Sequence, residues 1–137
     1  MKAIDLKSDY VVNPAALTNR APLFSFEIAD AEESTEYKIA VSSSRALLES
    51  GVYDMWESGV LDYTESGYAL YEGKSLKSDT GYYWAVLSGA GRHISDAAYF
   101  GIGLFQEDWR ARWVSRNAAS DVAPIFYRAF RWRKIRP

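Results

Sequence analysis

The sequence contains no cysteine and a single histidine, His93, among its 137 residues. Without cysteine the chain can form neither a disulfide nor a thiolate-ligated metal site. A metal site would have to combine His93 with carboxylates, and no ligand spacing around this residue supports one. The absence of cysteine does not by itself assign the protein to a reducing compartment.

Long apolar runs are also missing. No stretch approaches the ~20 apolar residues that span a bilayer as a helix. The N-terminal residues 1–5 lack the apolar stretch of a secretory signal. We therefore expect no membrane contact and slightly favour the cytoplasm. A periplasmic or secreted location is the alternative if a signal has been trimmed.

Positive charge is scarce over most of the chain and concentrated near its end. Residues 1–109 carry eight Lys and Arg against seventeen Asp and Glu, whereas residues 110–137 carry eight Lys and Arg and one acidic residue, Asp121. Such asymmetry is typical of a nucleic-acid tail or of two structural units that meet. No nucleic-acid-binding fold accompanies the basic residues. We therefore expect no nucleic acid and favour contact between the basic end and the acidic remainder.

Short runs rich in Val, Ile, Tyr, Phe and Trp alternate with turn residues along the chain. This pattern is typical of an all-β sandwich or barrel. The predicted strands lie at residues 3–6, 23–28, 37–41, 55–60, 67–71, 82–87 and 97–103. Aromatic side chains on one face of these strands are expected to fill the core, namely Phe24, Phe26, Tyr37, Tyr82, Trp84 and Phe100.

One short helix is predicted at residues 44–50. A serine among residues 42–44 can accept hydrogen bonds from the free amides of the first turn. Gly51 can adopt the left-handed conformation that ends a helix.

Residues 76–86, Leu-Lys-Ser-Asp-Thr-Gly-Tyr-Tyr-Trp-Ala-Val, resemble the sixth-strand region of fibronectin type III domains. A tyrosine near the start of that strand bonds to upstream backbone as a tyrosine corner, and Tyr82 is the candidate here. The resemblance implies an all-β, fibronectin type III-like (immunoglobulin-like) antiparallel sandwich of about seven strands with one short helix. An extra C-terminal strand would follow it.

Six motifs extend the resemblance over nearly the whole chain. In order they are Asn13-Pro14, Phe24-Ser25-Phe26, residues 37–43, residues 54–59, Tyr82-Tyr83-Trp84, and Gly103-Leu104 with residues 108–114. Together they are similar to the N-terminal region of bacterial α-L-rhamnosidases, where a fibronectin-like domain precedes a jelly roll and a catalytic (α/α)6 barrel. The resemblance implies a fibronectin type III-like domain at residues 1–104. Residues 105–137 would form an extension resembling the first strand of a truncated jelly-roll domain.

No catalytic, cofactor or metal site is predicted. The catalytic carboxylates of the family have no counterpart in these motifs, so no catalytic role is carried over. Asp54 and Glu57 form the one carboxylate pair considered for glycoside cleavage, and a turn in which Trp56 anchors a strand is the favoured interpretation. Ser95 and Asp96 near the single histidine lie in a predicted surface loop without an oxyanion-type turn.

The resemblance implies a non-catalytic accessory or structural module associated with a glycoside hydrolase. The alternative is a carbohydrate-binding module that recognises rhamnose-containing glycans through exposed aromatic side chains. Its candidate residues lie outside the seven predicted strands and are Trp109, Trp113 and Trp132.

Residues 125–133 alternate like one more strand, with no partner strand after them in the sequence. A lone strand leaves both edges open to pairing. We expect it to dock on its own sandwich or, by slight preference, on a second copy as a two-fold homodimer.

Overall fold

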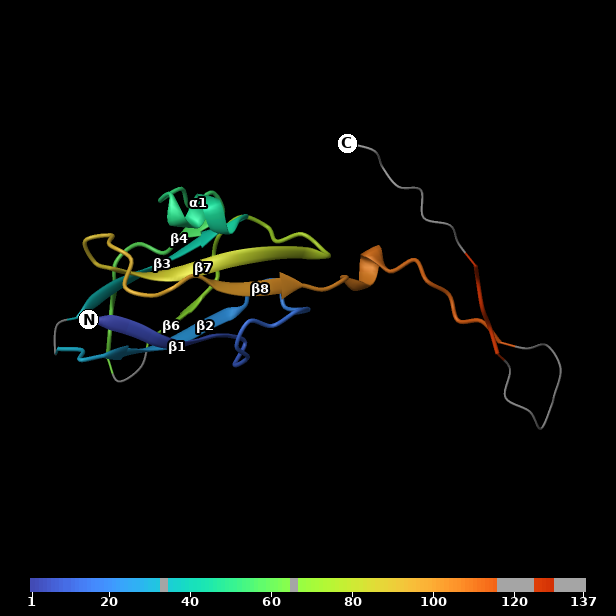
Figure 1. The fold of residues 1–137 in the computed structure, drawn as a ribbon, viewed down its shortest axis with the longest axis horizontal. Helices are drawn as coiled ribbons and strands as arrows, with labels where there is room; N and C mark the ends of the chain where they lie inside the picture. The colour runs from blue at the N-terminus through green and yellow to red at the C-terminus, as the bar shows by residue number, and fades with distance from the viewer. Residues whose placement is uncertain (33–34, 65–66, 116–124, 130–137) are drawn as a thin grey trace.

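Two antiparallel sheets face each other in the computed structural model, which describes residues 1–32, 35–64, 67–115 and 125–129 (Figure 1). The smaller sheet has the order β1-β2-β6 and consists of β1 (Lys2–Ser8), β2 (Leu23–Ala29) and β6 (Gly67–Leu70). The larger has the order β4-β3-β7-β8, with β5 also paired to β3. Its strands are β3 (Glu36–Ser42), β4 (Trp56–Glu57), β5 (Leu61–Asp62), β7 (Thr80–Ser88) and β8 (Ala98–Ile102). The predicted antiparallel sandwich is confirmed.

The described residues form eight strands, where about seven were predicted. Only Trp56–Glu57 of the predicted strand at residues 55–60 is a strand, β4, and β5 follows it at Leu61–Asp62. β4 pairs with the C-terminal half of β3 through Trp56 and Val41, whereas β5 pairs with its N-terminal half. Between them Gly59 has a φ of +69°, a left-handed conformation that glycine adopts without a steric penalty. The other six predicted strands are confirmed, with their ends within two residues of the expected positions.

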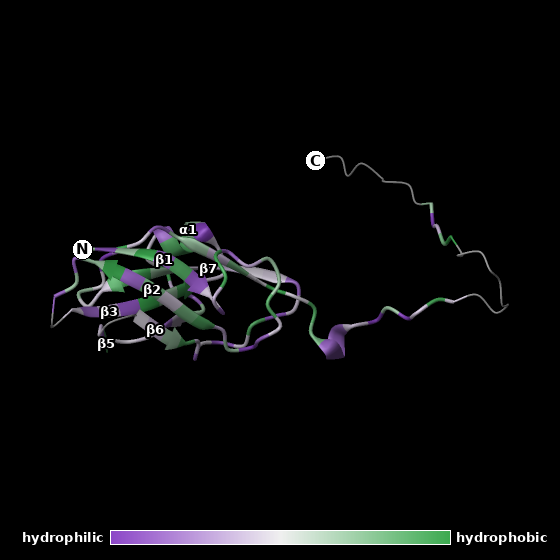
Figure 2. Ribbon diagram, turned by 90° about the horizontal axis from the view of Figure 1, so that it is seen from below, coloured by the Kyte–Doolittle hydropathy of each residue, from purple (hydrophilic) through white to green (hydrophobic). Residues whose placement is uncertain are grey.

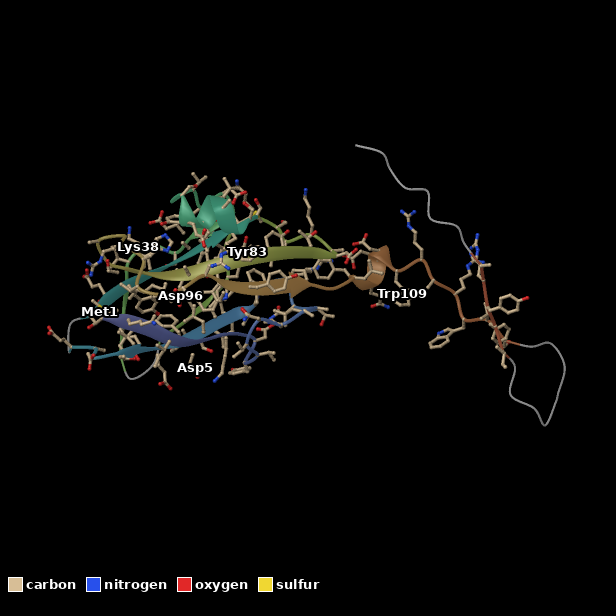
Figure 3. The ribbon with its side chains drawn as sticks, viewed as in Figure 1. Met1, Asp5, Lys38, Tyr83, Asp96 and Trp109 are labelled. Carbon is tan, nitrogen blue, oxygen red and sulfur yellow. The ribbon has the colours of Figure 1, made fainter. Side chains whose placement is uncertain are left out.

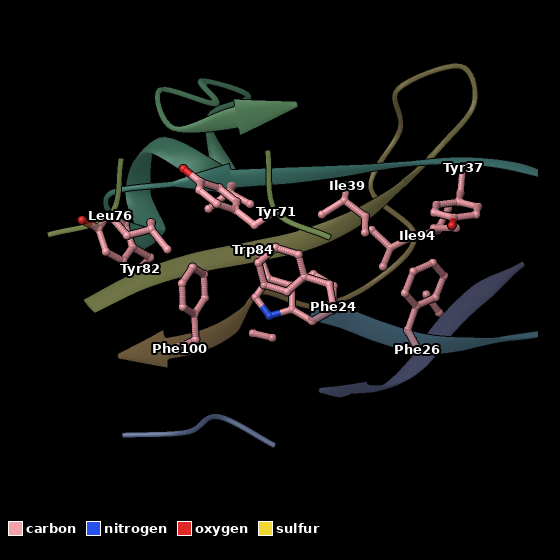
Figure 4. Packing of buried hydrophobic residues seen from close by; sticks show 14 of the residues in the cluster. Phe24, Phe26, Tyr37, Ile39, Tyr71, Leu76, Tyr82, Trp84, Ile94 and Phe100 are labelled. Atoms are coloured by element: carbon pink, nitrogen blue, oxygen red, sulfur yellow. The ribbon is translucent and has the colours of Figure 1, made fainter. Parts of the chain in front are cut away.

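The core lies between the two sheets and is rich in aromatic rings (Figure 4). Phe24 lies at its centre, with its ring centroid 4.5 Å from that of Trp84 and 5.4 Å from that of Phe100. Apolar and polar residues alternate along β2 (Figure 2), so this strand turns one face toward the core. All six aromatic residues predicted to fill the core are buried: Phe24, Phe26, Tyr37, Tyr82, Trp84 and Phe100.

The helix α1 (Arg45–Glu49) covers part of the outer face of the larger sheet. The hydroxyl of Ser44 accepts from the amide of Leu47 at 3.2 Å, and Gly51 follows the helix with a φ of +80°. Leu48 is fully buried and packs with Ala40, Ala85 and Leu87. The predicted helix and both of its end signals are confirmed, and the central strands β3 and β7 are therefore buried on both faces.

Tyr82 forms the predicted tyrosine corner. Its hydroxyl accepts from the backbone amide of Lys77 at 3.0 Å, and its ring stacks on Phe100 with centroids 5.5 Å apart. The contact ties the loop before β7 to the core. No helix in the described residues is long and apolar enough to span a membrane.

Residues 13–17 cover the outer edge of β8. The amide of Tyr99 donates to the side-chain oxygen of Asn13 at 2.8 Å, and the amide of Gly101 donates to the carbonyl of Pro14 at 2.8 Å. A side chain at Gly101 would collide with the carbonyl of Ala15, so this close approach requires glycine. The edge strand is thereby protected from pairing with another chain.

Beyond β8 the chain leaves the sandwich through the 3-10 helix η1 (Gln106–Asp108) as an extension (Figure 1). Residues 125–129 belong to no strand. Within the single chain, the strand predicted over residues 125–133 is not formed in its first five residues, because alternation without a neighbouring strand supplies no backbone partners. Pairing of this segment with a second copy stays a prediction. Residues 130–133 lie outside the described part of the chain.

Candidate interaction surfaces

Asp54 and Glu57 each form hydrogen bonds with a different neighbouring side chain. The carboxylate of Asp54 accepts from the amide of Ser43 at 2.9 Å and from its hydroxyl at 2.5 Å. Partial burial favours a higher pKa for Asp54, but the hydrogen bonds from Ser43 outweigh it and lower the pKa below its ordinary value. Glu57 accepts from the ammonium of Lys38 at 3.0 Å. The lowered pKa of Asp54 favours its charged form over the protonated acid that glycoside cleavage requires.

Trp56, between these carboxylates, anchors β4 on the core. Its ring centroid lies 5.4 Å from that of Tyr71 and 6.4 Å from that of Phe24. The favoured interpretation, a strand anchored by this tryptophan, is confirmed.

His93 is exposed, and its Nε2 atom lies 3.2 Å from the hydroxyl of Tyr53. The Ser95 hydroxyl accepts from the amide of Val86 and donates to the carbonyl of Asp96, both at 2.9 Å. The serine is thus engaged with backbone rather than with the histidine, and the predicted surface-loop role is confirmed. Within the described ranges, no group of three side chains could hold a metal ion.

The start of the extension is fixed to the sandwich. The guanidinium of Arg20 lies 3.8 Å above the centroid of the Phe105 ring and forms an ion pair with Glu107. Ser78 donates to the carboxylate of Asp108 at 2.6 Å and accepts from the amide of Phe105 at 2.9 Å. These contacts hold η1 at one end of the sandwich and set the direction in which the chain continues.

The predicted sugar-binding tryptophans do not gather into one site. Trp109 lines a shallow depression with Arg20 and Phe105 and is 63% exposed. Trp113 is fully exposed further along the extension. Trp132 lies outside the described residues. Sugar binding by this set stays a prediction.

The sequence did not predict a groove that lies over the outer face of the smaller sheet. It has a volume of about 930 Å³, and we call it the outer groove. Lys7 of β1, Ser25 of β2 and Tyr68 of β6 form one register row across it. On the outer face its lining residues come from the three strands and the segments that follow β1 and β6, and are Asp5, Lys7, Tyr10, Leu23, Ser25, Glu27, Tyr68, Leu70 and Glu72. The groove continues past the edge strand β6 to the larger sheet, where Trp56 of β4, Ser58 and Leu61 of β5 line it. The available signal was that Tyr68 and Leu70 lie on the same face of the strand predicted at residues 67–71.

An unusual turn holds Tyr10 at this groove. Ser8 and Val11 exchange backbone hydrogen bonds of 2.9 and 3.1 Å around Asp9 and Tyr10, whose φ angles are 46° and 68°. Two-residue turns with both central residues left-handed favour Asn and Gly, and a bulky residue there costs about 1–3 kcal/mol. The carboxylate of Asp9 accepts from the amide of Leu23 at 2.8 Å, which braces the turn.

An ion pair lies near the other end of the groove. The register of β1 against β2 shifts between Ile4 and Lys7, and Asp5 adopts a φ of 54°. The ammonium of Lys7 lies 2.6 Å from the carboxylate of Asp5. The irregular strand thus keeps two charged groups together on an otherwise regular sheet face.

Comparison with known proteins identifies the domain. A family model described as the Rha78A-like, N-terminal immunoglobulin domain matches residues 3–106. An α-L-rhamnosidase of Formosa agariphila is 31% identical over 128 residues, which are 87% of this chain and 13% of that protein. One from Streptomyces avermitilis is 31% identical over 124 residues, 85% of this chain and 12% of that protein.

Solved structures give the same result. The α-L-rhamnosidase from Dictyoglumus thermophilum aligns with a TM-score of 0.71 and 26% identity over 85% of this chain and 14% of its own. The Streptomyces avermitilis α-L-rhamnosidase complexed with L-rhamnose aligns with a TM-score of 0.66 and 28% identity, over 83% of this chain and 12% of its own.

The chain therefore spans only 12–14% of the relatives it matches. The matched part is their N-terminal immunoglobulin domain, and it is a non-catalytic, accessory part of these proteins. This chain belongs to the family of Rha78A-like N-terminal immunoglobulin domains.

Proposed function

We propose that this domain serves an α-L-rhamnosidase as an accessory module that packs against the following part of the enzyme through its extension. The observation that supports this is the apolar surface beyond η1. Trp113, Val114, Ile125 and Tyr127 are all exposed, the last two at 91% each. Exposed clusters of large apolar side chains mark interaction sites.

The extension is suited to a packed junction. Its anchored start, where Arg20 stacks on Phe105, fixes the exit direction. Burying one large apolar side chain stabilises an interface by about 1.5–3 kcal/mol. Arg110 and Arg112 lie between Trp109 and Trp113 in the sequence and can supply charged groups at the rim of such contacts.

A chimeric enzyme tests this function. The matched region of the Streptomyces avermitilis rhamnosidase would be replaced by this chain, and Trp113→Ser would be introduced both there and in the isolated domain. We expect Trp113→Ser to lower the melting temperature of the chimera and leave that of the isolated domain unchanged. Val52→Ser, at an exposed residue beside the helix end, is the matched control. A chimera as stable with Trp113→Ser as without it would refute the docking role.

A second candidate function is carbohydrate binding without cleavage. The outer groove favours it, because two exposed tyrosine rings, Tyr10 and Tyr68, border polar side chains there. One relative is described in complex with L-rhamnose, so we propose an L-rhamnose-containing oligosaccharide as ligand. Calorimetric titration of the full chain with an L-rhamnose-containing tetrasaccharide is expected to give saturable heat. No heat up to about 10 mM, well above a millimolar Kd, would refute this function.

A further inference from the structure

We infer that the sugar contact is the outer groove, with Tyr10 and Tyr68 as stacking rings, and that its ligand is an extended, uncharged oligosaccharide. This inference rests on the second candidate function above. In this inference the outer groove takes the place of Trp109, Trp113 and Trp132 as the sugar-binding site.

Two exposed aromatic rings stand on hydrogen-bonded backbone. Tyr10 is 76% exposed in the turn closed by Ser8 and Val11, and Tyr68 is 62% exposed on β6, which pairs with β2. The turn that carries Tyr10 is braced by the Asp9 carboxylate. The carbonyl of Tyr68 accepts from the hydroxyl of Tyr37 at 3.0 Å, which fixes the edge strand β6. Little conformational freedom would be lost when a ligand stacks on these rings.

The floor of the groove combines apolar side chains, among them Leu23 and Leu70, with polar ones. Ser25 on β2 is the register partner of both Lys7 on β1 and Tyr68 on β6, so a hydroxyl lies between the strand with the ammonium and the strand with the aromatic ring. Glu27 lies two positions further along the same strand and faces the groove. Alternating donors and acceptors beside an aromatic ring match the hydroxyl groups and apolar faces of a sugar chain. An apolar peptide would instead bury these polar groups without partners, which is unfavourable.

The charged side chains around the outer groove restrict which class of ligand it can bind. The groove is bordered by the carboxylates Asp5, Glu27 and Glu72 and by one ammonium, Lys7, which is already paired with Asp5. The excess of negative charge opposes a uronic-acid or sulfated chain. The volume of about 930 Å³, which includes the part of the groove beyond β6, falls within the size of ligand sites. An uncharged oligosaccharide fits both constraints.

The groove and the extension lie in different places. Asp5 stands below the smaller sheet, whereas Trp109 stands beyond η1 at the end of the sandwich (Figure 3). Substitutions at the two places can therefore separate the two candidate sites. A variant at one place leaves the other intact.

Titration of matched variants with the same tetrasaccharide tests the assignment. Tyr68→Ser removes one ring from an exposed position, and Tyr10→Asn removes the other while suiting its left-handed backbone. We expect each to bind about tenfold more weakly than the full chain, a change of about 1.4 kcal/mol. Trp113→Ala, the exposed aromatic control, is expected to bind like the parent. Thermal melts would establish that all variants are folded.

Nuclear magnetic resonance would locate the contact directly. Saturating sugar is expected to shift the amide signals of Ser25 and Tyr68. If Trp113→Ala abolishes binding while both tyrosine variants bind like the parent, the site assignment is wrong and sugar binding itself stands. If the parent binds no sugar, the function and the assignment both fail. If only a basic peptide shifts the groove signals, the groove is a protein contact and the assignment is overturned.

Discussion

Replacing Trp84 by alanine removes the largest fully buried side chain of the core. Trp84 lies on β7 with its ring 4.5 Å from Phe24 between ring centroids. Truncating a buried tryptophan costs about 3–5 kcal/mol, through lost burial and the cavity left behind. Single domains have free energies of unfolding of about 5–15 kcal/mol. The variant should therefore lose a large fraction of its stability.

Trp84→Phe provides the matched control. The indole Nε1 of Trp84 is buried and has no hydrogen-bond partner among the residues described here. Phenylalanine removes this unpaired donor and keeps most of the ring, so its cost should be about 1–2 kcal/mol. Urea unfolding followed by far-ultraviolet circular dichroism measures both values. A Trp84→Ala variant within about 1 kcal/mol of the parent would refute the core assignment.

Three further predictions concern hydrogen bonding, pH and assembly. Tyr82→Phe removes the acceptor for the amide of Lys77 and should cost about 1 kcal/mol in urea unfolding; an unchanged midpoint would show that the corner adds no stability. Burial, with smaller contributions from Tyr82 and Asp54, raises the pKa of Tyr71 to about 12, against about 10 when unfolded. The neutral form is thus favoured in the fold, so its stabilisation is complete below about pH 10 and is lost as the pH rises toward 12. Thermal melts of the parent and Tyr71→Phe across that range check this, and a parent equally stable at both ends would contradict it. We also propose a homodimer through the C-terminal residues; light scattering should give a dimer for the full chain and a monomer for a version ending at Ser115, and a monomeric full chain would refute it.

Much of the fold follows from local sequence. Alternation in residues 23–28 and 82–87 is enough to show which side chains point inward, because one face of each strand must be buried. Ser44 and Gly51 mark the ends of the helix by their own backbone and capping chemistry. The tyrosine corner at Tyr82 is equally local, since its partner lies five residues upstream.

The remaining features depend on tertiary contacts. The predicted strand at residues 55–60 is reduced to β4, and a separate β5 follows it at Leu61–Asp62. Both depend on how they pair with β3, which periodicity does not report. The turn at Asp9 and Tyr10 lacks the usual glycine or asparagine and is imposed by contacts with distant residues such as Leu23. The outer groove combines β1, β2 and β6, and the alternation of any one strand cannot show that surface.

The extension shows a second limit of prediction from periodicity. Its alternating residues predicted a strand, yet residues 125–129 form no strand in the described part of the chain. A strand requires a neighbour that supplies hydrogen bonds, and the sequence pattern specifies only the faces of the strand.

Hydrolysis of an aryl α-L-rhamnoside by the purified full chain is the most direct test of its non-catalytic character. We expect no release of the phenol above the rate in buffer, because Asp54 is bonded to Ser43 and Glu57 is paired with Lys38. Asp54→Asn and Glu57→Gln are the matched variants and should be indistinguishable from the parent. Turnover that persists through exhaustive purification and disappears in either variant would contradict the accessory role.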